Sequence, residues 1–126
     1  MKKVLFYFGL FAVFTLFFAS CGETTFDESL LIGKWKNDTR NEFYRYRANH
    51  TGGFWNEDED VTEDEMRRMT WSLNGSQLEH IYLPSDVMPG DVSVTRDFTI
   101  TVLNSTTLRY RDNFDGRTHS FTRVRE

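Results

Sequence analysis

The sequence predicts an all-β protein, an antiparallel meander of eight strands that closes into a barrel. From residue 31 onward, short runs of alternating apolar side chains recur, and apolar periodicity of helical length is absent. Turn residues separate these runs, and Asn74-Gly75 is the strongest hairpin signal because both positions tolerate positive φ. Short turns indicate antiparallel neighbours, and closure of such a sheet hides both of its edges. A two-sheet sandwich is the alternative architecture.

The expected strands follow one another along the chain and differ mainly in length. They cover 31–36, 42–48, a segment that begins at 54, 69–73, 77–83, 92–103 as one long or two short strands, 106–111 and 118–124. One short helix is expected at 62–68, where Thr62 would be the N-cap and Glu65 its partner in a capping box. Acidic residues at the start of this segment and arginines at its end suit the helix dipole.

The N-terminal segment has the pattern of a secretory signal. Met1-Lys2-Lys3 is followed by an almost purely apolar stretch, 4–18, and then by Ala19-Ser20-Cys21-Gly22. The stretch is shorter than the about 20 residues that a bilayer-spanning helix needs. An ordinary signal peptide and a retained anchor helix are the alternatives.

This segment resembles a bacterial lipoprotein signal peptide. The resemblance implies cleavage before Cys21, a diacylglyceryl group on its sulfur, and a lipid-anchored protein of the cell envelope. Gly22 and Glu23 lack the aspartate that often follows the cysteine in inner-membrane retention, so the resemblance favours the outer membrane. The chain would then consist of a signal peptide (1–20), an acylated cysteine with a polar tether (21–29) and a barrel domain (30–126).

Charge and cysteine content restrict the partners of this domain. The chain carries a formal charge of −4, and because Lys2 and Lys3 lie in the leader, the remainder is still more acidic. An acidic domain is a poor binder of nucleic acid, so no nucleic-acid partner is expected. Cys21 is the one cysteine, so the fold has no intrachain disulfide and is held by packing.

Four short motifs resemble, in their order along the chain, the lipocalin-like domains of bacterial lipoproteins. They are Gly33-x-Trp35, Thr51-Gly52-Gly53 before an aromatic strand, Trp71-x-Leu73-x-Gly75-x-x-Leu78, and Phe121-x-Arg123. The resemblance covers about residues 29–125. It implies that Trp35 packs at the closed end of the barrel under Arg123, in a cation–π contact.

An eight-stranded barrel can hold one small ligand, and large aromatic residues are expected inside this one. The aromatic residues expected to line or plug the interior are Tyr44, Tyr46, Trp55, Trp71 and Tyr82. His80 alternates with Leu78 and Tyr82 and is expected to face inward with them.

Arg96 is a further candidate for ligand contact. If 94–102 is one uninterrupted strand, Arg96 lies on the face of Phe98 and Ile100, where a buried guanidinium would need an acidic partner or a ligand. We favour the alternative, a bulge near 95–97 that turns Arg96 outward.

Metal sites and catalysis have weak support. Asn56, Asp58 and Asp60 alternate as in a calcium loop, but Val61 occupies the position where an EF-hand needs glycine, so a solvated loop is expected. His50, His80 and His119 do not have the short spacing of zinc ligands. No Gly-x-Ser-x-Gly elbow is present. We therefore expect no metal, no cofactor and no enzymatic activity.

We expect a membrane-anchored envelope lipoprotein whose barrel binds a small apolar or amphipathic ligand. The alternative is a filled barrel that acts as a structural or protein-interaction module of an envelope complex. Large aromatic side chains fill space in a small barrel, which makes this alternative nearly as strong.

Overall fold

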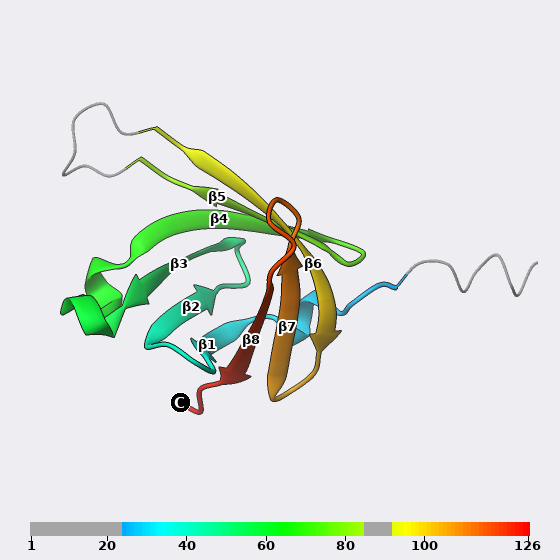
Figure 1. Ribbon diagram of the computed structural model, residues 1–126, viewed down its shortest axis with the longest axis horizontal. Coiled ribbons are helices and arrows are strands. Elements are labelled where there is room, and N and C mark those ends of the chain that lie inside the picture. The colour runs from blue at the N-terminus through cyan, green and yellow to red at the C-terminus, as the bar shows by residue number, and fades with distance from the viewer. Residues whose placement is uncertain (1–23, 85–91) are drawn as a thin grey trace, which may run out of the picture.

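In the computed structural model, residues 24–84 and 92–126 are described, and they form a closed barrel of eight antiparallel strands (Figure 1). The strands are β1 (Gly33–Asn37), β2 (Glu42–Tyr46), β3 (Thr51–Asn56), β4 (Arg67–Asn74), β5 (Gln77–Tyr82), β6 (Val94–Leu103), β7 (Thr107–Asp112) and β8 (Thr118–Arg123). Each strand pairs with the next, and β8 pairs with β1 to close the sheet. The predicted barrel is confirmed, and the sandwich alternative is wrong. The predicted signal peptide and Cys21 lie outside the described residues.

The hairpin between β4 and β5 forms where Asn74-Gly75 predicts it. Asn74 pairs with Gln77, and Gly75 has a φ of 65°, a conformation that a side chain disfavours. Along β4, Met69 and Trp71 are buried on one face and Ser72 is exposed on the other. This alternation is the period of a half-buried strand, and it sets which side chains enter the barrel.

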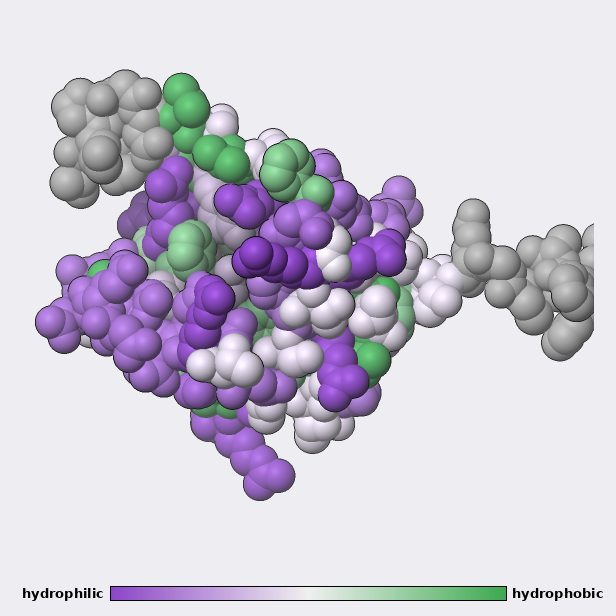
Figure 2. Space-filling model, viewed as in Figure 1, coloured by the Kyte–Doolittle hydropathy of each residue, from purple (hydrophilic) through white to green (hydrophobic). Residues whose placement is uncertain are grey.

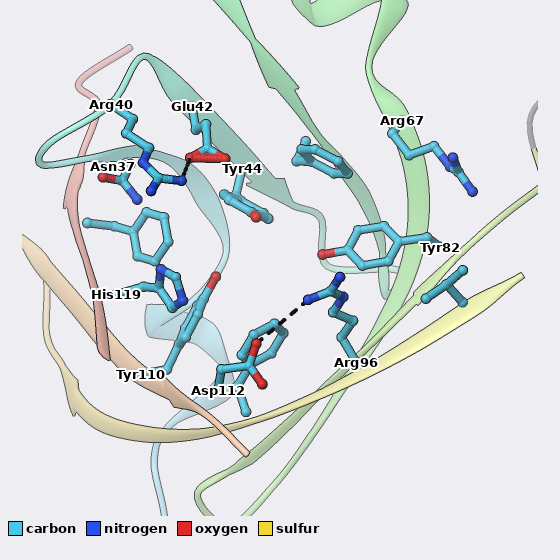
Figure 3. Close-up of a pocket in the computed structure, with 14 residues that line it drawn as sticks. Asn37, Arg40, Glu42, Tyr44, Arg67, Tyr82, Arg96, Tyr110, Asp112 and His119 are labelled. Carbon is cyan, nitrogen blue, oxygen red and sulfur yellow. Dashed lines mark ion pairs between the residues drawn. The ribbon is translucent and has the colours of Figure 1, made fainter. Parts of the chain in front are cut away.

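Strand β6 runs without interruption past the position where a bulge was favoured. Its pairing with β5 is continuous from Val94 to Thr99, and the irregularity lies later, between Ile100 and Val102 opposite β7. Arg96 therefore keeps the inward face of Phe98, and the favoured outward position of Arg96 is wrong. Figure 3 shows its side chain among those that line the interior.

The helix predicted at 62–68 is reduced to one 3₁₀ turn. The helical segments in the described residues are η1 (Glu28–Leu30), η2 (Glu57–Glu59) and η3 (Glu63–Glu65). The side chain of Thr62 makes no cap bond to the backbone, and Arg67 already begins β4, where it pairs with Phe54 of β3. Pairing of the sheet thus overrides the local helix signal. Within the described residues, no helix has the length and apolar composition to cross a membrane.

Tightly packed side chains fill the end of the barrel that lies beneath η1. Trp35 is completely buried, and its indole Nε1 donates a hydrogen bond to the Leu31 carbonyl oxygen at 2.9 Å. The guanidinium of Arg123 lies 4.3 Å from the Trp35 ring centroid, so the predicted cation–π contact is present. Gly33, with a φ of 136°, passes so close to Arg123 that a Cβ there would collide with the guanidinium. We call this the closed end of the barrel.

The segment before β1 is attached to this closed end. The backbone N–H of Phe26 donates to the Gly75 carbonyl oxygen at 3.1 Å, and the Phe26 ring packs against the core. Asp27 caps η1 by accepting from Ser29, and Glu28 pairs with His50 at 2.9 Å. Phe26, Asp27 and Glu28 therefore hold part of the segment expected to be a tether against the barrel. Hydrophilic residues cover most of the barrel face in Figure 2.

Candidate ligand pocket at the open end of the barrel

A cavity of about 370 Å³ lies at the other end of the barrel, which we call the open end (Figure 3). Its walls come from the turn between β1 and β2, from Phe54 of β3, and from the ends of β4 to β8 that lie farthest from the Gly75 hairpin. The volume is within the range of about 300–1,000 Å³ found for small-molecule sites. It equals the share of about a dozen molecules in liquid water.

Aromatic rings form the floor of this pocket. Tyr44 stacks on Phe54 at a centroid distance of 5.6 Å and meets Phe121 edge-on at 5.4 Å. Phe54 in turn meets Tyr82 edge-on at 5.3 Å. Such ring pairs are favourable beyond the area they bury, so the floor is both apolar and rigid.

Three tyrosine hydroxyls give this floor a polar centre. The hydroxyls of Tyr44, Tyr82 and Tyr110 point toward one another in the pocket (Figure 3). Burial raises the pKa of Tyr44 to about 12, and it raises the pKa values of Tyr82 and Tyr110 further. All three hydroxyls therefore stay protonated at neutral pH and can donate hydrogen bonds.

His80 supports the floor from below. Its ring is fully buried; Nε2 lies 2.7 Å from the Tyr46 hydroxyl and Nδ1 lies 2.9 Å from the Tyr82 hydroxyl. Burial lowers the pKa of His80 to about 3, so the imidazole is neutral and has one N–H donor.

The hydrogen-bond partners fix the tautomer of His80. Among the described residues, His80 is the hydrogen-bond partner of the Tyr46 hydroxyl, which is fully buried. The Tyr46 hydroxyl must therefore donate to Nε2, because a buried hydroxyl proton without an acceptor is costly. The proton then sits on Nδ1 and is donated to Tyr82. The Tyr82 hydroxyl is also hydrogen-bonded to the Tyr44 hydroxyl, which in turn is bonded to Tyr110.

Arginines surround the pocket mouth. Arg96 Nη1 lies 3.7 Å from Asp112 Oδ2, and Arg40 Nη1 lies 3.6 Å from Glu42 Oε2. The Nε of Arg67 donates to the Leu83 carbonyl oxygen at 2.9 Å. Among the described residues, the lining thus contains three arginines and two carboxylates.

Arg96 lies inside the mouth and not in the core, and this explains how an inward arginine is accommodated. Its side chain is 56% exposed, and its carboxylate partner comes from β7. The desolvation that would have favoured an outward position is therefore largely avoided. Sequence reasoning lacked this information because Asp112 is distant in the chain.

The residues predicted to contact ligand lie in three different places: the pocket, the core beneath it and the outer face of the barrel. Tyr44, Tyr82 and Arg96 line the pocket. Tyr46, Trp71 and His80 lie beneath it and fill the barrel, and the Trp71 Nε1 donates to the Thr51 carbonyl oxygen at 3.0 Å. Trp55 lies outside the barrel, so its predicted interior position is wrong.

The position of Trp55 follows from strand alternation. Its neighbour Phe54 faces inward, so Trp55 faces outward and stacks on Phe43 of β2 at 5.3 Å. Lys34 covers both rings, with Nζ 5.2 Å from each centroid. The Nε1 of Trp55 is buried without a hydrogen-bond partner in the described structure. This outer cluster is separate from the pocket.

Several pocket residues were not predicted from the sequence. Glu42 is two residues before Tyr44, and Asp112 is two residues after Tyr110, so alternation along β2 and β7 would have placed both carboxylates inward. His119 is two residues before Phe121 on β8 and follows the same alternation. Arg40, on the turn before β2, gave no comparable signal, and its approach to the mouth depends on the register of distant strands.

The metal alternatives can be compared with the structure. Among the described residues, no group of three or more His, Cys, Asp or Glu side chains is placed to hold a metal ion. Asn56 caps η2 by accepting from the Asp58 backbone N–H, and Asp58 accepts from Asn41 at 2.8 Å. His119 lines the pocket, whereas His50 packs on Trp71 at the closed end.

Comparisons with known proteins support the fold. No model of a known protein family matches the chain, and no curated protein matches it either. The barrel is similar to the crystal structure of a lipocalin-like protein from Bacteroides uniformis, with a TM-score of 0.51 and 19% sequence identity. The match covers 76% of this chain and 99% of that protein. The chain therefore has the fold of a lipocalin-like protein.

Proposed function

We propose that this protein binds a small apolar or amphipathic ligand in the pocket at the open end of its barrel. The observation that carries the proposal is the cavity of about 370 Å³ with an aromatic floor and a few convergent polar groups. Ligand sites in proteins have this composition. The lipocalin-like fold is consistent with it.

The filled lower half of the barrel limits the size of the ligand. Trp35, Tyr46 and Trp71 occupy the volume beneath the tyrosine floor, so a ligand can enter only the upper half. A short chain or a single ring system fits this volume better than a long lipid. The filled half also supports the alternative, an interaction module. A second observation in its favour is that Leu83, Val92 and Val94 are exposed large hydrophobic residues near the mouth.

We propose a binding protein and not an enzyme. The buried His80 is neutral and lies behind Tyr82, so it is not positioned to take a proton from a ligand. The carboxylates of Glu42 and Asp112 each face an arginine. This arrangement favours electrostatic recognition of a ligand over general acid–base chemistry.

We further propose that a lipid on Cys21 anchors the protein in the cell envelope, with the outer membrane the preferred location. Cys21 is five residues from Phe26, a length that spans at most about 18 Å. Because Phe26 is attached to the closed end, the anchor would hold that end near the membrane and the pocket would open away from it. Replacement of Cys21 by alanine should abolish metabolic labelling with palmitate and release the protein from the membrane fraction.

Ligand binding can be tested on residues 22–126, which contain all eight strands and their common core. Native mass spectrometry of protein purified from a cell extract should show a co-purifying small molecule that is lost on denaturation. Ligands that bind the folded state should raise the thermal midpoint in a concentration-dependent way. Fatty acids of graded length are suitable first ligands, and retinoids and bile acids test the upper limit of size.

A pair of variants identifies the site. Val94 lines the mouth, and Thr101 is exposed on the same strand but does not line the pocket. Val94→Trp should reduce the ligand-dependent rise in midpoint, and Thr101→Trp should preserve it. A clean apo mass together with no shift across the ligand series would contradict the proposal and favour the interaction module, to be pursued by crosslinking in the envelope.

A further inference from the structure

The guanidinium of Arg96 has hydrogen-bond donors that the described protein does not use. Its ion pair with Asp112 measures 3.7 Å, which is longer than the about 2.7–2.9 Å of a charge-assisted hydrogen bond. A guanidinium carries five N–H donors. Since 56% of the side chain is exposed at the mouth, these donors face the pocket and the solvent.

Arg45 provides a comparison, because its guanidinium is hydrogen-bonded to two carboxylates of the same molecule. It lies on the outer face of β2, where it bonds Glu63 at 2.8 Å and Glu126 at 2.6 Å. Both contacts are short enough to be direct hydrogen bonds. The ion pairs of Arg96 and Arg40 at the mouth are about 1 Å longer than the Arg45–Glu63 bond. The arginines at the mouth therefore still have N–H donors that can bind an anion, whereas Arg45 already donates to two carboxylates.

The tyrosine floor adds a donor of its own. The Tyr44 hydroxyl is hydrogen-bonded to Tyr82 and to Tyr110, and these two bonds use two of the three hydroxyl protons. Tyr44 and Tyr82 both lie within the electrostatic influence of Arg96. The third hydroxyl proton and the Arg96 guanidinium thus converge on one volume above the aromatic rings (Figure 3). Both are donors, so the group that satisfies them is an acceptor.

We infer that the pocket selects a small amphipathic carboxylic acid, whose carboxylate binds Arg96 and the remaining hydroxyl proton of the tyrosine floor and whose apolar part lies on the Tyr44, Phe54 and Phe98 rings. A carboxylate matches the planar fork of a guanidinium, and Asp112 already presents this chemistry to Arg96. Asp112 remains in place, because its other oxygen accepts from the Phe114 backbone N–H at 2.8 Å. This inference rests on the proposed ligand-binding function.

Matched ligands separate the charged group from the apolar chain. Octanoate, 1-octanol and octylammonium share one alkyl chain and differ only in the terminal group. Binding of each to residues 22–126 can be measured by isothermal titration calorimetry at pH 7. Arg96→Gln removes the charge at the mouth, and Arg109→Gln, on the exposed face of β7, is the matched control.

Octanoate should bind about tenfold to hundredfold more tightly than 1-octanol, the range expected for hydrogen bonds to a charged group. Octylammonium should bind most weakly. Arg96→Gln should lower the affinity for octanoate to that for 1-octanol and leave the alcohol unchanged, whereas Arg109→Gln should preserve the preference. Circular dichroism and urea unfolding verify that each variant is folded.

Two results would overturn the inference in distinguishable ways. Equal affinities for octanoate and 1-octanol, or an acid preference that survives Arg96→Gln, would refute the carboxylate site and leave the proposed ligand-binding function intact. Absence of binding by all three ligands to the wild-type barrel would refute the carboxylate inference. Together with the absence of a co-purifying molecule, it would also remove the proposed function.

Discussion

Acidification from pH 7 to pH 5 should destabilise the barrel through His80 alone by about 2 kcal/mol. Burial lowers the pKa of His80 to about 3 in the folded state, whereas the unfolded chain has the ordinary value of about 6.5. Between these values the unfolded chain binds a proton that the folded protein does not bind. The free energy of unfolding therefore rises with pH across this window and falls as the solution is acidified.

The magnitude follows from this difference in proton binding. The folded ring stays unprotonated between pH 7 and pH 5, so protonation of the unfolded chain alone sets the loss, which integrates to about 2 kcal/mol. Carboxylates contribute mainly at lower pH. A hydrogen bond from Arg45, for example, lowers the pKa of Glu126 below its usual value. The interval from pH 5 to pH 7 is therefore the one in which His80 can be isolated.

The assay is urea unfolding at pH 5, 6 and 7. His80→Gln keeps an acceptor for Tyr46 and a donor for Tyr82 but has no titratable ring, so its stability should change by about 2 kcal/mol less than that of the wild type over this interval. His50→Gln, on the exposed turn, controls for the loss of a histidine and should retain the steep dependence because His80 is intact. An unchanged pH dependence in His80→Gln would refute the assignment of a neutral, buried imidazole.

Other substitutions test the packing that holds the pocket in place. Arg123→Ala should lower the free energy of unfolding by about 2–4 kcal/mol in urea titrations. It removes the cation–π contact with Trp35 and charged hydrogen bonds, including the one to the Ser105 carbonyl oxygen. Arg123→Lys should restore only part of this stability. Trp55→Phe should stay within about 1 kcal/mol of the wild type in calorimetry, because it also removes a buried donor that lacks a partner. Trp71→Phe, which loses the bond to Thr51, should cost more, and equal losses would contradict this reasoning. Gly52→Ala should cost at least about 2 kcal/mol, since its Cβ would collide with the backbone carbonyl of Arg45, and a wild-type thermal midpoint would exclude that contact.

The barrel could be predicted because its signals are local. Met69, Trp71 and Leu73 alternate along one strand, and Asn74-Gly75 marks its end, so strand and hairpin follow from neighbouring residues. Closure followed from the need to hide sheet edges. The helix at 62–68 failed for the opposite reason, because pairing of Arg67 with Phe54 is a contact between strands that no local pattern records.

The site was harder to predict because it depends on which face of each strand points inward. Phe54 and Trp55 are adjacent aromatic residues, so alternation sends one inside and one outside but does not say which. The register of β3 against β2 settles it, since Trp55 pairs with Phe43 on the outer face. Arg96 was predicted to face outward because burial of an unpaired guanidinium is costly, and this argument assumed a deeply buried position. The exposed mouth and Asp112 remove that penalty, and both arise only once the barrel is closed.

His80 marks the level at which the barrel changes from a packed core to a pocket. Its Nε2 accepts from Tyr46 in the core below, and its Nδ1 donates to Tyr82 in the pocket floor above. An apolar residue at this position would leave the buried Tyr46 hydroxyl without its partner in the described structure, at about 1–3 kcal/mol, and would remove one of the two bonds of Tyr82, so the layer is stable only as a unit. The floor is therefore fixed before a ligand arrives, and a ligand meets donors that need no further ordering. Changes at His80 should consequently appear in both unfolding and binding, whereas changes at Trp35, far from the mouth, should appear in unfolding alone.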